Sequence, residues 1–331
     1  MLLPVRDAVA TLGACLDSLA AQTLADHEVI AVDDGSRDGS GELLLDRAPK
    51  DPRLRVRRTP PLGLVPALSL SLAEARAPLV ARMDADDVAL AERLALQVER
   101  LERDRSVDVL GSRVALLAPP GETPGEGMRA YVEWQNGLLD HDAIFRDRFV
   151  ESPLVHPSVA ARADALRGLG GWRAFEGPED YDLWLRALDA GLRFAKLPET
   201  LLGWRDGTTR LTRVDPRYAP ARFLALKLAA LARGPLAGAR SAVVWGAGPL
   251  GKAWSRALRA RGHALEAFVE VDPRKIGQRV HGAPVVSVEA AGLLRGPLHL
   301  AAVGQRGARG RIRAEALRLG LEEGRDLVAV A

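Results

Sequence analysis

Residues 2–87 alternate short apolar runs with amphipathic segments, and this alternation limits the fold more than any other feature of the chain. The apolar runs predict strands at 2–6, 27–34, 53–59 and 78–87, and the segments between them predict helices. In the first such segment, Val9, Leu12, Leu16 and Leu19 recur at helical spacing. The resulting β-α-β-α-β-α-β order implies a parallel, doubly wound sheet with helices on both faces.

Carboxylates follow two of these predicted strands. Asp33 and Asp34 end the second strand, and Asp84, Asp86 and Asp87 end the fourth. Ligands of such sheets bind beyond the carboxyl ends of the strands, and like charges gathered there repel one another unless a cation or hydrogen-bond donors compensate them. The plainer interpretation of either motif alone is that Asp and Gly gather in turns and at helix N-termini. Their joint placement favours a ligand.

The chemistry of the two groups differs. Mg²⁺ and Mn²⁺ prefer carboxylate oxygens, water and substrate phosphates, so the Asp84–Asp87 group is suited to a divalent cation that carries a nucleoside diphosphate. Ionised carboxylates accept hydrogen bonds and do not donate them. Asp33 and Asp34 are therefore suited to the N–H groups of a base or the hydroxyls of a ribose.

Composition excludes several classes of protein. The length of 331 residues suits two domains. The net charge is +3 and charges of both signs are interspersed, so the sequence shows no basic cluster of the kind that binds nucleic acid. Cys15 is the one cysteine, so disulfides within the chain and thiolate metal clusters are excluded, and a buried thiol is expected. No run reaches the length of about 18 apolar residues that a spanning helix needs, so we expect a cytoplasmic protein. The first predicted strand starts at Met1, which leaves a longer natural N-terminus open.

The order of these motifs resembles the inverting family 2 glycosyltransferases of the GT-A fold. Those enzymes share a Pro-Val start, here Pro4-Val5, a strand that ends Asp-Asp-Gly-Ser, and an Asp-x-Asp cluster. The similarity continues through residues 154–205, which look like the acceptor half of the members that assemble bacterial polysaccharides. The resemblance implies an α/β fold with a GT-A nucleotide-diphospho-sugar transferase domain at 1–215, a connecting helix and linker at 216–239, and a small Rossmann-like domain at 240–331.

The resemblance also implies roles for single residues. Asp180 would be the catalytic base, beside Glu179, because a sugar hydroxyl needs a carboxylate to take its proton. The metal, Mg²⁺ or Mn²⁺, would bind Asp86 with Asp84 and Asp87, and a nucleotide sugar, most simply a UDP-sugar, would contact these residues: Pro4, Arg6, Asp33, Asp34, Asp84 and Arg205. The competing interpretation of 179–182 is an acidic first helical turn that complements the helix dipole, and Asp182 is expected to be structural.

Two departures from the family pattern and several further candidates remain. Arg6-Asp7 replaces the usual aromatic-Asn pair, and Ser69 replaces an Asn, which predicts an unusual donor preference. Arg205 would neutralise the diphosphate, with Arg210 and Arg213 as alternatives. His156 either contacts the acceptor or the diphosphate, or is a hydrogen-bonded loop residue. Trp172 and Trp184 either stack on an acceptor sugar or pack in the core.

The last third of the chain begins a second α/β pattern. Gly246, Gly248 and Gly251 form G-x-G-x-x-G between an apolar run and a helix, and Glu270 or Asp272 lies where a ribose-binding acid is expected. This region resembles the N-terminal domain of bacterial sugar acyltransferases. We expect an accessory nucleotide-binding or docking module, with an inert structural fold as the alternative and no residues for hydride transfer. The helix before it, within 221–240, either contacts an anionic membrane surface or packs between domains.

The leading hypothesis is a metal-dependent inverting glycosyltransferase of hexosyltransferase type. It would move a sugar from a nucleotide donor to a glycan or lipid-linked acceptor in surface polysaccharide biosynthesis, in the cytoplasm or peripherally at the inner membrane. A sugar nucleotidyltransferase is disfavoured because residues 4–15 lack a Gly-rich basic loop. A non-catalytic nucleotide-sugar sensor is disfavoured because residues 84–87 and 178–180 are intact. The oligomeric state stays open.

Overall fold

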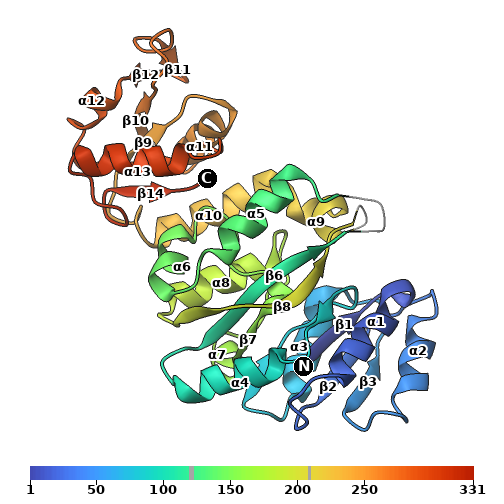
Figure 1. Ribbon diagram of the computed structural model, residues 1–331. Coiled ribbons are helices and arrows are strands. Elements are labelled where there is room, and N and C mark those ends of the chain that lie inside the picture. The colour runs from blue at the N-terminus through green and yellow to red at the C-terminus, as the bar shows by residue number, and fades with distance from the viewer. Residues whose placement is uncertain (119–122, 208–209) are drawn as a thin grey trace. The chain divides into compact units, whose positions relative to one another are not determined.

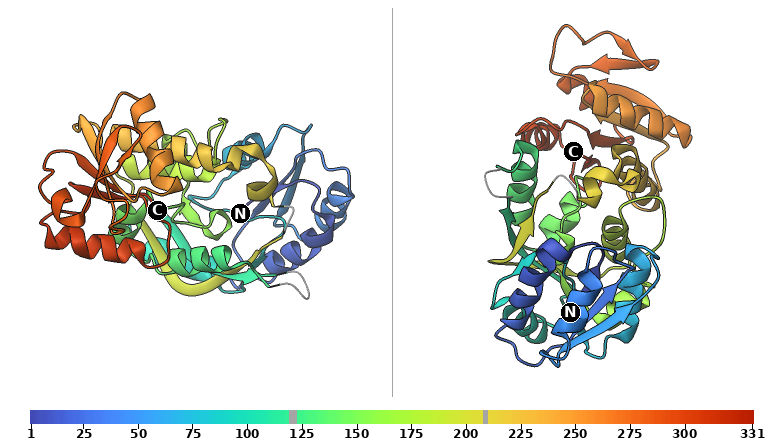
Figure 2. Two further views of the ribbon diagram at one scale, coloured as in Figure 1. Left: turned by 90° about the horizontal axis from the view of Figure 1, so that it is seen from above. Right: turned by 90° about the vertical axis from the view of Figure 1, so that its right-hand side faces the viewer.

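The computed structural model describes residues 1–118, 123–207 and 210–331, which form two compact units (Figures 1 and 2). Unit 1 comprises Met1–Ile144 and Pro153–Asp215. Unit 2 comprises Phe145–Ser152 and Pro216–Ala331. The chain therefore leaves unit 1 for eight residues, 145–152, and returns to it before entering unit 2 for good.

Unit 1 begins with the parallel sheet that the alternation predicts. β1 (Leu2–Val5), β2 (Val29–Asp33) and β3 (Leu54–Arg58) pair in that order, and every residue of β1 and β2 is buried. Helices α1 (Val9–Ala20) and α2 (Ser40–Arg47) cover one face, and α3 (Leu64–Glu74) covers the other (Figure 1). Alternate residues of β2 accordingly enter different core clusters, since Val29 and Ala31 pack with α1 and Ile30 and Val32 pack with α3.

The second sheet of unit 1 is mixed, which differs from the all-parallel expectation. Its order is β4-β7-β6-β8-β5, formed by β4 (Leu79–Ala81), β5 (Val88–Ala89), β6 (Val109–Leu117), β7 (Ala160–Arg162) and β8 (Phe194–Arg205). β4 touches the first sheet through one parallel bridge between Leu2 and Arg82, and its other edge pairs antiparallel with β7. β7 comes from much later in the chain, so local periodicity carried no sign of this pairing.

The remaining helices of unit 1 are α4 (Arg93–Arg103), α5 (Glu126–Asn136), α7 (Ala163–Gly168), α8 (Glu179–Asp189) and the short α9 (Leu211–Val214), with the 3₁₀ turn η1 (His156–Ser158). Helix α6 (His141–Asp147) begins in unit 1 and ends in unit 2. Helix α8 buries Leu183, Trp184 and Leu188 in a core shared with Phe194 of β8. Burial of that apolar stripe fixes the direction in which the acidic start of α8 points.

Unit 2 has one six-stranded sheet of order β11-β12-β10-β9-β13-β14. Its strands are β9 (Ser241–Trp245), β10 (Ala264–Val269), β11 (Arg279–Val280), β12 (Ala283–Val286), β13 (Leu298–Ala301) and β14 (Leu327–Ala329). Apart from β11, all of them run parallel. After β9 the chain adds β10 and β12 on one side of that strand and then β13 and β14 on its other side, as in doubly wound nucleotide-binding sheets. The helices of the unit are α10 (Pro220–Arg233), α11 (Pro249–Ala260), α12 (Val288–Ala291) and α13 (Ala308–Arg318), with the turn η2 (Pro216–Tyr218).

The helix expected to be a linker, α10, is part of unit 2. Leu226, Leu228 and Leu231 on its apolar side are buried, and Lys227 donates to the carbonyl of Val150 at 2.6 Å. The apolar face that contact with a membrane surface would require is thus used in packing. Among the described residues, none of the helices combines the length and the apolar character needed to cross a bilayer.

Segment 145–152 is held to the rest of unit 2 by buried charge. Asp147, 2% exposed, pairs with Arg313 of α13, which also pairs with Glu323 at 2.7 Å. Phe149 in the same segment is 1% exposed. The predicted boundary after residue 215 places residues 145–152 in the first domain, whereas in the structure they belong to unit 2.

Candidate active site

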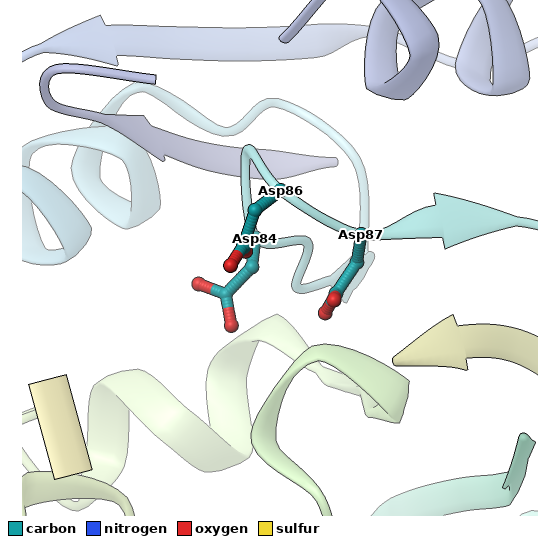
Figure 3. A group of neighbouring side chains, drawn as sticks. All are labelled: Asp84, Asp86 and Asp87. Carbon is teal, nitrogen blue, oxygen red and sulfur yellow. The ribbon is translucent and has the colours of Figure 1, made fainter. Parts of the chain in front are cut away.

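Three carboxylates gather in the loop between β4 and β5. Asp84, Asp86 and Asp87 each offer an oxygen within 4.8 Å of the others, and their side chains point to the same side of the loop (Figure 3). The loop is held at both ends, because β4 pairs with β7 and β5 pairs with β8. The sequence motif thus forms one compact acidic group at the carboxyl end of β4.

Asp87 is the buried member of this group, 1% exposed. Its Oδ1 accepts the backbone N–H of Arg205 at 2.7 Å, whereas its Oδ2 is buried and has no hydrogen-bond partner among the described residues. Burial, and then the charges of Asp84 and Asp86, raise the pKa of Asp87 well above its ordinary value. Burial and Asp84 likewise raise the pKa of Asp86 to about 6.

These residues fit a divalent cation. Carboxylate oxygens are the donors that Mg²⁺ and Mn²⁺ prefer, and a buried carboxylate oxygen without a donor is costly unless a positive charge compensates it. Burial and the repulsion among the three carboxylates raise the pKa values of Asp86 and Asp87. A bound cation would relieve both effects. Asp84, Asp86 and Asp87 are therefore the residues that could hold a metal.

Two buried arginines lie behind the acidic loop. Arg82, 5% exposed, forms an ion pair with Asp84 Oδ2, and Arg93, fully buried, donates to the carbonyl of Arg82 at 2.8 Å. Burial would lower the pKa of Arg82, but Asp84, Asp87 and Glu179 outweigh it, so the pKa is raised. No sequence pattern marks either arginine as part of the site, although Arg82 lies two residues before Asp84.

The carboxylates at the end of β2 are already partnered by the protein. Asp33 Oδ2 accepts from Arg58 at 3.1 Å, and its Oδ1 accepts the N–H of Ser36 at 2.9 Å. Asp34 Oδ1 accepts the N–H of Leu62 at 2.6 Å, and its Oδ2 that of Gly63 at 2.9 Å. Both carboxylates are buried, so their first effect is to shape the loops at this edge of the sheet.

Arg6, just after β1, is an exposed group at this edge. Its Nη1 donates to Asp34 Oδ2 at 3.0 Å, and half of its side chain, 50%, is exposed. Pro4 lies buried within β1, in register with Val32. Of the donor contacts expected at this edge, Arg6 is therefore the accessible one.

Glu179 and Asp180 begin α8 but differ in access. Glu179 is 4% exposed, while Asp180 is half-buried and its Oδ1 accepts the N–H of Tyr181 at 2.7 Å. Glu179 is one of the charges that raise the pKa of Arg82, the partner of Asp84, so the start of α8 lies close to the acidic loop. Asp182 pairs with Arg186 at 2.7 Å, in keeping with its expected structural role.

His156 and the two tryptophans are buried. Trp172 Nε1 donates to His156 Nε2 at 3.0 Å, which puts the proton of the neutral imidazole on Nδ1, 3.9 Å from Glu179 Oε1. Burial, helped by Arg82, lowers the pKa of His156 well below its ordinary value. A cationic contact with diphosphate does not fit this histidine, and a sugar stack does not fit Trp172 or Trp184, which are 4% and 1% exposed.

In unit 2 the glycines of the G-x-G-x-x-G segment form a tight turn before α11. Gly246 has φ of +101°, a Cβ there would lie 2.6 Å from Val303 Cγ2, and a Cβ on Gly251 would collide with the carbonyl of Gly246. A Cβ on Gly248 would meet no atom within 4 Å. Glu270, rather than Asp272, reaches this turn, since its Oε1 accepts the N–H of Ala247 at 2.9 Å.

An α/β domain of this topology, with an acidic group at the carboxyl edge of its sheet, has the GT-A fold of nucleotide-sugar transferases. The chain belongs to glycosyl transferase family 2, whose family model matches residues 1–167. It is therefore a glycosyltransferase, and neither of the two alternatives, a sugar nucleotidyltransferase or a non-catalytic sensor, is retained.

Two relatives illustrate the family at the level of sequence. The amylovoran biosynthesis glycosyltransferase AmsE of Erwinia amylovora is 31% identical over 195 residues, which are 59% of this chain and 70% of that protein. The UDP-Gal:alpha-D-GlcNAc-diphosphoundecaprenol beta-1,3-galactosyltransferase of Escherichia coli is 26% identical over 207 residues, 62% of this chain and 72% of that protein.

A solved structure supports the fold. The mannosyltransferase PcManGT of Pyrobaculum calidifontis, solved with GDP-Man and Mn²⁺, matches with a TM-score of 0.53 and 19% identity over 78% of this chain and 67% of its own. In three further matched structures, with TM-scores of 0.52 to 0.54, the chain spans 64% to 65% of the solved chain, less than two thirds of its length. At such identities the likeness concerns the fold alone.

Proposed function

We propose that this glycosyltransferase is metal-dependent and inverting, and that it transfers a sugar from a nucleotide-sugar donor to a glycan or lipid-linked acceptor in surface polysaccharide biosynthesis. The observation that carries the proposal is the acidic group Asp84, Asp86 and Asp87, close to the start of α8. Within the part of the chain that the structure describes, the buried Oδ2 of Asp87 has no hydrogen-bond partner. A metal site and a carboxylate base in one place are what such a transfer requires.

The donor is proposed to bind at the carboxyl edge of β1, β2 and β4. Its base and ribose would meet Arg6 and the loop that Asp33 and Asp34 organise, beside Pro4, and its diphosphate would lie at Asp84 and Asp86. We propose a UDP-sugar, because the Escherichia coli relative is named for UDP-Gal. That name also specifies a diphosphoundecaprenol acceptor, which supports a lipid-linked acceptor here and would bring the enzyme to a membrane surface.

Asp180 is proposed to take the proton of the acceptor hydroxyl as its oxygen bonds to the anomeric carbon of the donor. The bond from that carbon to the diphosphate oxygen breaks, and its electron pair leaves with the nucleoside diphosphate. When bound to Asp84, Asp86 and Asp87, Mg²⁺ or Mn²⁺ supplies positive charge that offsets the charge developing on the diphosphate. A single displacement of this kind inverts the anomeric configuration.

The test is release of nucleoside diphosphate from UDP-, GDP- and dTDP-sugars, with a glycan and with a lipid-linked acceptor, in Mg²⁺, in Mn²⁺ and in chelator. We expect release from one donor, dependent on acceptor and metal, and a product of opposite anomeric configuration by NMR. Undiminished release in chelator would overturn the metal dependence. Retained configuration would overturn the single displacement.

For unit 2 we propose an accessory nucleotide site at Gly246, Gly248 and Gly251. The left-handed turn at Gly246 and the open approach at Gly248 support it, because a phosphate can come close to backbone N–H groups there. Glu270 and Lys275, which pair at 2.9 Å, would lie beside the ribose and the phosphates. Direct titration of UDP and NAD against the protein, in chelator to silence the site of unit 1, tests this second site.

A further inference from the structure

We propose that unit 2 binds an anionic lipid surface through one side of α11 and the adjoining segment 271–279. This docking role goes beyond the proposed transfer reaction. It is carried by four cations that have no carboxylate partner in the described part of the chain. They are named the basic surface and comprise Lys252, Arg256 and Arg259 of α11 with Arg279 of β11.

The charge of the chain is divided unevenly between the two units. Unit 2 contains 21 arginines and lysines against 10 aspartates and glutamates, a net charge of +11, whereas the whole chain carries +3. Unit 1 therefore carries −8. A strongly basic unit joined to an acidic one indicates a partner with many negative charges, and the uncompensated cations of the basic unit indicate where that partner binds.

Most carboxylates of unit 2 already have basic partners. Asp272 pairs with Arg274 and Glu270 with Lys275, each at 2.9 Å. Further ion pairs lie at α13 and near the end of the chain: Asp147 and Glu323 with Arg313, Glu289 and Glu315 with Arg318, and Glu322 and Asp326 with Arg325. By contrast, the members of the basic surface form no ion pair with any described residue, so the excess charge of unit 2 is concentrated there.

The cations of α11 lie along one side of the helix. Lys252, Arg256 and Arg259 recur at i, i+4 and i+7, and α11 contains no acidic residue that would interrupt them. Trp254 and Leu258 are buried on another side, where α11 packs on β9 and β10. Arg256 and Arg259 are exposed and Lys252 is half-buried, so the charges face solvent.

The turn between β11 and β12 extends the basic surface beyond the helix. Arg259 Nη1 donates to the carbonyl of His281, and Arg279 Nη2 donates to the carbonyl of Gly282. The two guanidinium groups therefore end at neighbouring carbonyls. Because both acceptors are neutral, neither positive charge is cancelled.

Segment 271–279 runs beside α11. Just before it, Glu270 Oε1 accepts the N–H of Ala247, in the turn that precedes α11, at 2.9 Å. Just after it, the carbonyl of His281 accepts from Arg259 in the last turn of the helix. The two ends of the segment are thus held at the two ends of α11, and the segment lies next to the basic surface.

This segment exposes apolar side chains. Val271 is 81% exposed and Ile276 is 37% exposed, and Arg274 lies between them in the chain. A bilayer offers acyl chains to the apolar side chains as well as anionic headgroups to the cations. The phosphate backbone of a nucleic acid would contact the cations alone. The combination therefore favours a lipid surface.

The experiment measures sedimentation of the full-length protein with vesicles of phosphatidylcholine alone and of phosphatidylcholine with about one third phosphatidylglycerol. We expect binding to the anionic vesicles only, weakened by added salt. The triple variant Arg256→Gln, Arg259→Gln, Arg279→Gln is expected to bind them roughly 100-fold more weakly, because each cation near such a surface contributes about fivefold.

The matched control removes the same charge elsewhere in unit 2, at the exposed side chains Arg295, Arg318 and Arg325. Changed together to glutamine, these are expected to keep binding within about threefold, because charges far from the contact are screened. Equal binding by the two triple variants would overturn the proposal. Wild-type protein that binds neither kind of vesicle, or binds both alike, would also overturn it.

Val271→Ser separates lipid from nucleic acid. We expect it to weaken binding to anionic vesicles by about three- to tenfold, through the loss of apolar contact, and to leave binding to a DNA duplex unchanged. If the wild type binds DNA more tightly than the vesicles and Val271→Ser changes neither, the surface belongs to a nucleic acid and the lipid proposal is wrong.

Arg256→Glu covers the case in which the triple variant does not fold, as judged by thermal unfolding. This side chain has no hydrogen bond or ion pair with the described residues, so its charge can be reversed without loss of a contact. Unchanged vesicle binding in Arg256→Glu would overturn the proposal. None of these assays measures sugar transfer, so failure of the lipid proposal and failure of the proposed function are observed separately.

Discussion

The backbone N–H of Arg205 donates to Asp87 Oδ1 at 2.7 Å across 118 residues of chain. This bond joins the end of β8 to the acidic loop, and among the described residues the other oxygen of Asp87 has no hydrogen-bond partner. One oxygen of the Asp87 carboxylate therefore holds the loop in place, and the other is available to a cation.

Asp87→Asn tests that division, because an amide can keep its oxygen on the N–H of Arg205 while the group loses its charge. We expect the fold to persist and the affinity for Mn²⁺ to fall by at least about tenfold. Titration of Mn²⁺ into the metal-free protein measures this. Asp164→Asn, at a side chain that is 95% exposed, is the control for loss of one charge. Equal affinity in the two variants would remove Asp87 from the proposed metal ligands.

Asp180→Asn tests the base. The amide cannot accept the proton of the acceptor hydroxyl, so we expect kcat to fall by about 10²- to 10⁴-fold, with donor affinity unchanged within about twofold. Steady-state turnover and donor titration give the two numbers, again with Asp164→Asn beside them. A variant that turns over at the wild-type rate would move the base elsewhere on α8 or its preceding loop.

Glu28 makes stability depend on pH. Burial alone would raise the pKa of this carboxyl, but hydrogen bonds from Arg76 and Arg55 lower it to about 2 from an ordinary value of 4.5. Its stabilisation is therefore complete above pH 4.5 and is lost as the pH falls through 2. We expect Glu28→Gln to lower the free energy of unfolding by about 2 kcal/mol at pH 7, with the deficit shrinking toward pH 2. Urea unfolding at pH 7 and pH 3 checks this, and a deficit that is the same at both values would contradict it.

Gly248→Ala tests the proposed site in unit 2. Gly248 has φ of −78° and open space where a Cβ would stand, so alanine is expected to leave the thermal midpoint unchanged. The added methyl group would nevertheless obstruct a phosphate that approaches the backbone. Loss of UDP or NAD binding with an unchanged midpoint is the expected result. Gly310→Ala, in α13 and also without neighbours within 4 Å, is the matched control; if the two variants bind alike, Gly248 does not line a nucleotide site.

Removal of residues 216–331 is expected to destabilise the fragment that remains. A fragment of residues 1–215 keeps segment 145–152 but deprives Asp147 of Arg313 and the Val150 carbonyl of Lys227. It also exposes the apolar ring of Phe149. Arg146 still pairs with Asp147 at 2.9 Å in the fragment, but the loss of the Arg313 and Lys227 contacts and the newly exposed apolar surface are expected to lower the thermal midpoint and to cause aggregation. A fragment as stable as the whole chain, by scanning calorimetry, would show that the segment is dispensable.

Much of the site was predictable because its residues follow strands. Asp33, Asp34, Asp84, Asp86 and Asp87 stand at strand ends that the apolar runs mark, and parallel strands bring such ends to one edge. The partners of these carboxylates were not predictable. Arg58 and Arg82 are two among many arginines, and which carboxylate a long side chain reaches depends on the packing around it.

The sequence by itself determined the start of unit 1, the acidic group and the glycine turn of unit 2, because hydrophobic periodicity and turn residues act locally. Only the tertiary structure decided the pairing of β4 with β7, the membership of segment 145–152 in unit 2, and the burial of His156 and Trp172. Periodicity records that a residue is buried and toward which face. It does not record which distant part of the chain covers that face. Here distant parts of the chain bury Glu179 but leave Asp180 half-buried, and they bring the backbone N–H of Arg205 to Asp87.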